Sequence, residues 1–105
     1  MRPPPFTLDE IVSWFRLKQG TLAGSGVTLS DIRERSEHLP AAAADFNGTG
    51  TLGEIDVWAS GEFDFHVLRA SDGEDIFFRQ LKVSAIGVDL ESTYAEFLRA
   101  METLA

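Results

Sequence analysis

Hydrophobic and polar residues alternate along residues 53–67, and this alternation is the clearest pattern in the chain. A period of two is typical of strands with one buried and one solvated face. Residues 59–61 interrupt the alternation as a three-residue loop, with Gly61 in the left-handed position that closes such a loop. The loop sets the apolar residues of the two arms opposite one another: Val57 with Phe63, and Ile55 with Phe65. The segment is therefore predicted to form a β-hairpin.

The other face of this hairpin is acidic and carries one large aromatic residue. It comprises the six side chains that alternate with the apolar ones: Glu54, Asp56, Trp58, Glu62, Asp64 and His66. The register sets Asp56 directly opposite Asp64, and like charges that face one another across strands cost stability. A cationic partner would relieve this repulsion, so the face is predicted to bind one. The alternative for Trp58 is that it packs across the strand against Lys82 or Phe78.

The N-terminal region carries the signals of an amphipathic helix. Thr7 and Glu10 form a capping box, and Gly20 is expected to end the helix. The apolar residues follow helical spacing and make one stripe: Leu8, Ile11, Val12 and Phe15. Trp14 lies beside this stripe, and we expect it to be a partly buried packing residue.

Residues 21–40 have the least regular pattern. Val27 and Leu29 alternate as in a strand, but Ile32 breaks the parity. A short helix capped by Ser30 is the alternative. We favour an edge strand over residues 26–34.

The remaining segments complete an antiparallel meander. A weak strand is predicted over residues 41–46 and a well-defined one over 76–83. Turns are expected at residues 47–50 and 71–73. Extending the pairing places Arg79 opposite Phe65 on the apolar face, where a charge is unusual. A bulge near Phe78 would turn this arginine outward.

A second amphipathic helix, capped near Asp89, is predicted at the C-terminus. Its apolar stripe comprises Leu90, Tyr94, Phe97, Leu98, Met101 and Leu104. The predicted fold is α+β: an N-terminal helix, an antiparallel β-meander of four to five strands and a C-terminal helix. Both helices are expected to pack on one face of the sheet, which leaves the acidic face uncovered.

Composition narrows the functional classes. The 105 residues are predicted to form a single domain, residues 1–105. There are no cysteines, so disulfides and thiolate chemistry are excluded. The net charge of −8 argues against nucleic acid and anionic membranes as partners and permits a basic protein. No signal peptide or membrane span is recognisable, so a cytoplasmic location is expected.

Two glycine-containing motifs compete within residues 45–56. Residues 48–53 satisfy G-x-G-x-x-G, but the dinucleotide fingerprint needs a helix after it, and a strand is predicted there. Residues 45–56 follow the EF-hand loop, except that Asp56 replaces the bidentate glutamate of the twelfth position. The predicted flanks are strands rather than helices, so calcium binding is retained only as an alternative.

Catalytic residues are not recognisable. The histidines, His38 and His66, have no partnered nucleophile at a readable spacing. Asp64 and His66 share a strand face, but two ligands fall short of a metal site. On an open sheet nothing is expected to desolvate Asp56 or Asp64, or to shift the pKa of either carboxyl. No catalytic residue, metal or cofactor is therefore predicted, and the protein is not expected to be an enzyme.

Several segments resemble the TriTu family of bacterial immunity proteins. They are L-G-E-I-D-V-W-A-S-G-E-F-D-F-H-V-L, D-G-E-D-I-F-F, an N-terminal I-V-S-W-F and a C-terminal E-S-T-Y-A-E-F-L. The most specific letters are Gly53, Ile55, Trp58, Ser60, Gly61 and Asp64. The resemblance implies a cytoplasmic protein that binds and blocks a toxin delivered between competing bacteria. In the family's naming case this toxin is an ADP-ribosyltransferase that acts on elongation factor Tu.

The residues and the resemblance together predict an inhibitor that occludes the active site of a cognate toxin. The expected partner is a protein that is basic around its active site, and the expected contact surface is the acidic hairpin face. Two alternatives stay open at this point. One is a calcium-binding module on residues 45–56, and the other is a small-molecule-binding α+β domain with a pocket between helices and sheet.

Overall fold

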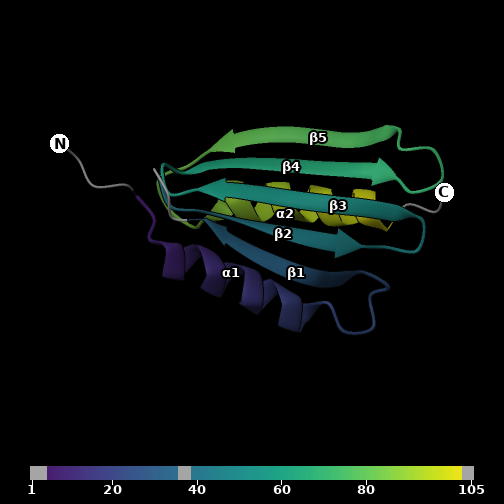
Figure 1. The fold of residues 1–105 in the computed structure, drawn as a ribbon, viewed down its shortest axis with the longest axis horizontal. Coiled ribbons are helices and arrows are strands. Elements are labelled where there is room, and N and C mark those ends of the chain that lie inside the picture. The colour runs from purple at the N-terminus through teal and green to yellow at the C-terminus, as the bar shows by residue number, and fades with distance from the viewer. Residues whose placement is uncertain (1–4, 36–38, 103–105) are drawn as a thin grey trace.

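The computed structural model describes residues 5–35 and 39–102, and within them the chain forms a five-stranded antiparallel sheet with one helix at each end. In chain order the elements are α1 (Leu8–Thr21), β1 (Thr28–Arg35), β2 (Ala41–Asn47), β3 (Thr51–Trp58), β4 (Glu62–Arg69), β5 (Asp75–Lys82) and α2 (Val88–Met101). The strands lie in the order β1-β2-β3-β4-β5, so each is hydrogen-bonded to its neighbour in sequence (Figure 1). The predicted α+β meander is confirmed.

The capping box predicted for the first helix is present. The side chain of Thr7 accepts a hydrogen bond of 3.2 Å from the backbone N–H of Glu10, and the Glu10 carboxylate accepts one of 3.1 Å from the N–H of Thr7. The helix α1 ends at Thr21, one residue beyond Gly20. The helix α2 begins at Val88, within one residue of the start predicted near Asp89, but its N-cap residue is Gly87, so no side chain caps it. Leu104 and His38 lie outside the described residues.

The central hairpin has the predicted register. Ile55 is paired with Phe65 and Val57 with Phe63 across β3 and β4, so all four apolar side chains point to the same, buried face. Gly61 has a φ of 95°, and its N–H donates a hydrogen bond of 2.9 Å to the carbonyl of Trp58. A left-handed backbone conformation suits glycine because it has no Cβ. The three-residue loop is thereby confirmed.

The predicted edge strand is also present, and a bulge explains its irregular pattern. The register between β1 and β2 shifts between Leu29 and Asp31, which adds one residue to β1. A bulge of this kind reverses the face of every residue that follows it. Leu29 and Ile32 therefore both point to the helix-covered face, as do their partners on β2, although their spacing of three is not that of a regular strand.

Arg79 lies opposite Phe65, as the pairing predicted, and stays on the helix-covered face. The bulge in this part of the sheet is at the start of β5, between the partners of Val67 and Leu68, and not near Phe78. Because β5 is an edge strand, Arg79 reaches the carboxylate of Glu96 on α2 at 3.0 Å and packs over the ring of Phe77. The expectation that a bulge turns Arg79 outward is therefore wrong.

Both helices cover the same face of the sheet. Figure 1 shows α2 running behind the strands, where it contacts β3, β4 and β5, while α1 packs along β1 and β2. Trp14 is only 5% exposed, so the expectation of partial burial is wrong. Its Nε1–H donates a hydrogen bond of 2.9 Å to Glu91, which also pairs with Lys18. This partly buried contact joins α1 to α2.

The approach of α2 to the sheet depends on Gly53. A side chain at this position would point toward the helix, where its Cβ would lie 2.9 Å from Cζ of Phe97 and would also overlap Met101. Beside it on β3, the hydroxyl of Thr51 donates a hydrogen bond of 2.6 Å to the carbonyl of Met101. The absence of a side chain at Gly53 therefore allows the last turns of α2 to pack directly on β3.

Candidate binding face

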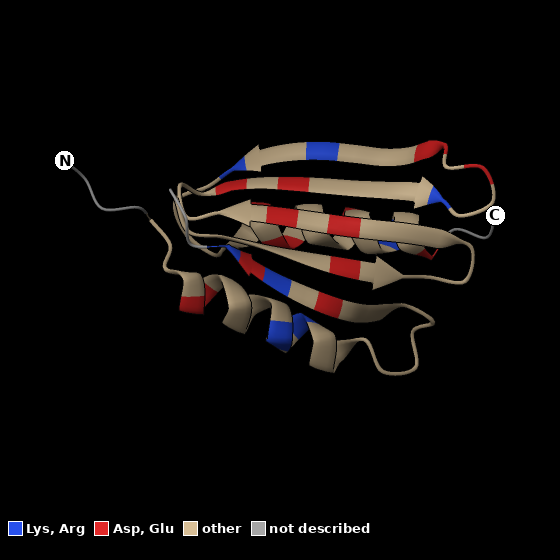
Figure 2. Cartoon of the chain, viewed as in Figure 1, with Lys and Arg blue, Asp and Glu red and all other residues tan. Residues whose placement is uncertain are grey.

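The six side chains predicted to share one face do so. They lie on the side of β3 and β4 away from both helices, and we call this set the acidic face: Glu54, Asp56, Trp58, Glu62, Asp64 and His66. Glu62 is exposed, and the other five are partly buried by their neighbours on the sheet. In Figure 2 acidic positions lie side by side on the neighbouring strands β3 and β4. No helix of the described residues covers these side chains.

Arg33 on β1 extends the acidic face across the sheet. Its guanidinium lies 2.8 Å from carboxylate oxygens of both Asp45 on β2 and Glu54 on β3. Asp45 and Glu54 are directly paired across these strands. A row of one cation and two anions therefore crosses three strands on the uncovered side.

Asp56 is the most perturbed carboxyl of the face. It faces Asp64 across β3 and β4, as the sequence predicted. Burial, a hydrogen bond shared with Glu54 and the charges of Glu54 and Asp64 raise its pKa to about 7. Burial alone would raise the pKa of Glu54 too, but hydrogen bonds from Asp56 and Arg33 lower it below its ordinary value. The expectation that nothing would shift the pKa of Asp56 is therefore wrong.

Trp58 lies at the end of β3 beside a flat part of the sheet. Its cross-strand partner on β2 is Ala41, and the next residue of β2 on this face is Ala43. Both alanines are buried although no helix within residues 5–35 and 39–102 covers them. Phe78, one of the two residues against which Trp58 was expected to pack, lies edge-on against the ring of His66, with centroids 5.5 Å apart. The indole thus stands beside short side chains rather than beneath a covering layer.

Two polar contacts tie the acidic face to β5. His66 Nε2 lies 2.7 Å from a carboxylate oxygen of Asp75. The side-chain amide of Gln80 donates a hydrogen bond of 3.3 Å to Asp64. These contacts hold His66 and Asp64 toward the outer strand, β5.

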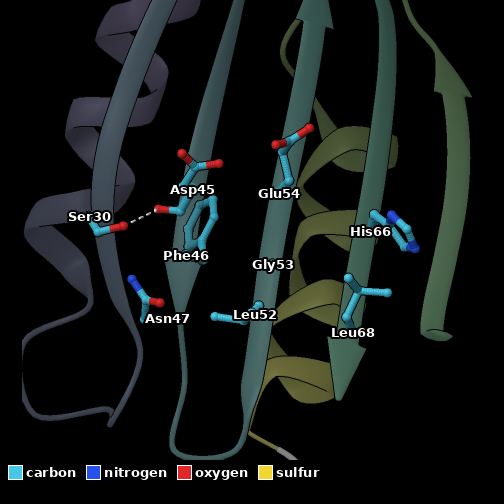
Figure 3. A pocket seen from close by; sticks show the side chains of 9 residues that line it. All are labelled: Ser30, Asp45, Phe46, Asn47, Leu52, Gly53, Glu54, His66 and Leu68. Carbon is cyan, nitrogen blue, oxygen red and sulfur yellow. Dashed lines mark hydrogen bonds between the residues drawn. The ribbon is translucent and has the colours of Figure 1, made fainter. Parts of the chain in front are cut away.

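A hollow of about 350 Å³ adjoins the acidic face where β1, β2, β3 and β4 meet (Figure 3). Its lining includes two members of the acidic face, and in full comprises Ser30, Asp45, Phe46, Asn47, Leu52, Gly53, Glu54, His66 and Leu68. The sequence interpretation missed this extension. The pairing of β2 with β3 would have predicted this hollow. That pairing can be inferred from the sequence only if the turn at residues 47–50 is used to set the register of the two strands.

The two glycine-containing motifs do not form the structures that calcium binding or dinucleotide binding would require. Residues 45–56 lie in β2, the following turn and β3, and the helices that flank an EF-hand loop are replaced by strands. The strand β3 likewise occupies the place of the helix in a dinucleotide fingerprint. Among the residues that the structure describes, no group of three or more His, Asp or Glu side chains is placed to hold a metal ion.

The helix side of the molecule has a different hollow, of about 620 Å³, between α1 and the start of α2. Leu17 and Ile86 line it and are 64% and 46% exposed, so it is open to solvent. Ligand pockets typically enclose most of the molecule that they bind. This hollow is not closed in that way.

Comparison with known families supports one of these interpretations. The model of a family described as "Immunity protein TriTu" matches residues 9–100 of the chain. The chain belongs to the TriTu family of immunity proteins. The match spans both helices almost completely and all five strands, including the whole acidic face. No curated protein matches the chain.

Membership of the TriTu family gives this fold an immunity function, which is to neutralise a toxin. A toxin is a protein partner, so this TriTu protein needs a surface that binds another protein. The described helices include none that is long and apolar enough to cross a membrane.

Proposed function

We propose that this TriTu protein acts in the cytoplasm and blocks its toxin by covering the active site with the acidic face. No reaction is catalysed in this mechanism, because neutralisation requires only that the toxin's substrate be excluded. The proposed toxin is basic around its active site, and the class to test first is an ADP-ribosyltransferase that acts on elongation factor Tu.

One observation carries the proposal: carboxyl groups are held against one another on a sheet face that no described helix covers. Asp56 and Asp64 face each other across neighbouring strands, and Glu54 lies two residues from Asp56 on the same face of β3. Like charges opposed across strands destabilise the free protein. A cation supplied by a partner would convert this repulsion into attraction, and carboxylates in such an arrangement also accelerate encounter with a basic partner.

Trp58 is the proposed anchor within this charged surface. Central aromatic residues contribute much of the binding energy at protein interfaces, because they bury a large apolar area at low entropic cost. Trp58 stands beside Ala41 and Ala43 and is only partly buried, so a partner side chain can contact the exposed part of the indole. The acidic groups around it would then steer the partner, while the indole holds it.

The direct test is calorimetric titration of the protein with its cognate toxin domain. Trp58→Ala should weaken binding by about 2 kcal/mol or more, which is the usual effect of removing a central aromatic anchor. Its melting temperature should stay close to that of the unchanged protein, since the indole is not in the core. Leu17→Ala is the matched control, because it removes an exposed apolar side chain from the helix side.

Two outcomes would contradict the proposal. Unchanged affinity for Trp58→Ala together with a loss for Leu17→Ala would move the interface to the helix side. A large fall in the melting temperature of Trp58→Ala would mean that the indole supports the fold rather than the interface.

A further inference from the structure

The two edges of the sheet are protected to different extents. An edge strand exposes unpaired N–H and C=O groups, and proteins usually shield it with bulges, charges or a covering element. The edge strand β1 has all three. It contains the bulge between Leu29 and Asp31, and Gln19 of α1 donates a hydrogen bond of 3.0 Å to the carbonyl of Leu29. Half of its residues are charged: Asp31, Arg33, Glu34 and Arg35.

The other edge, β5, is less shielded. It is eight residues long and contains no proline, and its bulge is confined to the start of the strand. Phe78, in its centre, is 55% exposed. In Figure 1 no described element lies beyond β5 in the plane of the sheet. This combination is typical of an edge that pairs with another strand.

The direction of the backbone groups on β5 follows from one hydrogen bond. The N–H of Val83 donates to the carbonyl of Gly61 at 2.9 Å, so Val83 faces the preceding strand. In an antiparallel ladder this orientation alternates from residue to residue. The N–H and C=O groups of Phe78, Gln80 and Lys82 therefore point outward, away from β4.

We propose that two copies of this chain pair through β5 in antiparallel orientation, with Gln80 on the two-fold axis. The two five-stranded sheets become one continuous sheet with both pairs of helices on the same side. Such an isologous contact places each residue i of one strand opposite residue 160 − i of its partner. Gln80 then faces Gln80 of the second copy.

Charge and geometry favour this register over those centred on Arg79 and Phe78. Centring on Arg79 would oppose two arginines directly, which is unfavourable. Centring on Phe78 would bring the bulge at the start of β5 into the paired region. Centring on Gln80 uses the straight part of the strand, residues 77–83. It sets Phe78 against Lys82 of the second copy and Phe77 against its Val83, a cation–π pair and an apolar pair.

In this register no like charges of the two edges stand directly opposite, because Arg79 faces Leu81 and Lys82 faces Phe78 of the second copy. The straight part of β5 carries Arg79 and Lys82 and no acidic residue, in a chain whose net charge is −8. Arg79 is already paired with Glu96. The contact therefore avoids the acids that would make two copies repel each other at most other surfaces. Because the net charges of the copies still repel at long range, added salt should strengthen the dimer.

The test is sedimentation velocity of the whole chain at concentrations up to about 100 µM, since dimerisation follows mass action. The unchanged protein should contain a dimer whose fraction rises with concentration and with salt. Phe78→Lys should abolish it, because each new lysine would face Lys82 of the second copy. Combining Phe78→Lys with Lys82→Glu should restore it through two opposite-charge pairs, which a merely unfolded variant would not do.

A disulfide provides an independent measure of the register. Because the chain has no cysteine, Gln80→Cys introduces a single thiol. Opposed residues of a hydrogen-bonded antiparallel pair have Cα atoms about 5.5 Å apart, within the range of a disulfide. Mild oxidation should join Gln80→Cys into a covalent dimer faster than the control Ser71→Cys, whose exposed thiol lies in the turn before β5. A monomer at all concentrations, or equal oxidation rates for the two variants, would overturn the proposal.

Discussion

Asp56 lies on β3 with Asp64 directly across on β4 and Glu54 two residues away on the same face. Its pKa of about 7 in the folded protein compares with 3.8 for the same group in water. The folded state therefore binds a proton more tightly than the unfolded state does. Stability from this group is complete below about pH 4 and is lost as the pH rises through 7.

Replacing Asp56 with asparagine, which keeps the shape and cannot ionise, should therefore stabilise the protein at pH 8. The expected gain is on the order of 1–2 kcal/mol, after allowing for solvent screening at a partly exposed site. At pH 5 the difference should be smaller, because the native aspartic acid is then protonated. Urea unfolding at both pH values measures it, with Glu62→Gln as the control on the same face. A gain independent of pH would show that charge at Asp56 is not the cause.

The face on which each residue of the acidic face lies could be predicted from the sequence. The shifted pKa of Asp56 and the ion pair between Arg33 and Glu54 could not. Alternation along β3 and β4 places Asp56 and Asp64 on one face and opposite each other, because the side-chain period of a strand is fixed. Desolvation of Asp56 and the bridge from Arg33 to Glu54 depend on β1 and β2. The sequence of these strands does not show which neighbours stand beside Asp56.

The packing of α2 on β3 depends on the missing side chain at Gly53. Gly53→Ala should destabilise the protein by about 1–3 kcal/mol, since the new methyl group overlaps Phe97 and Met101 in a close-packed core. Gly20→Ala in α1 is the matched control. Apart from its chain neighbours and the backbone of its own helix, no atom lies within 4 Å of the added methyl group, and alanine should favour the helix by roughly 0.5–1 kcal/mol. Denaturant unfolding of both variants measures the contrast, and equal effects would contradict this account of α2.

Elements were predictable where one local signal dominated. The capping box fixed the start of α1, and the loop at residues 59–61 fixed the register of β3 with β4. Elements were less predictable where a distant contact decides the outcome. Arg79 is neutralised on the helix side by Glu96 of α2, and the N–H of the buried Trp14 is satisfied by Glu91. Both partners lie on a helix far away in sequence.

Acidic residues are concentrated on β3 and β4, on the side of the sheet that the helices leave uncovered (Figure 2). Such a field raises the rate at which a basic partner arrives, and salt screens it. Combining Asp56→Lys with Asp64→Lys changes the net charge from −8 to −4. Association with a basic toxin should then slow by roughly tenfold or more at low salt, with a smaller effect on dissociation.

Stopped-flow association at several salt concentrations measures this effect. Combining Glu34→Lys with Glu102→Lys produces the same net charge from exposed positions outside the acidic face. If both double variants slow association equally, net charge alone guides the toxin. If only the first does, the guidance is local to the acidic face.

The single layer of helices has a further consequence for how such a protein can change. On β3 and β4, successive side chains point alternately into the core, which stabilises the fold, and to the uncovered face, which contributes little to the core. Every second residue of the hairpin can therefore be exchanged without repacking the interior. A different toxin surface could be matched by substitutions at alternate positions of two strands, and the same scaffold could be re-targeted by design in this way.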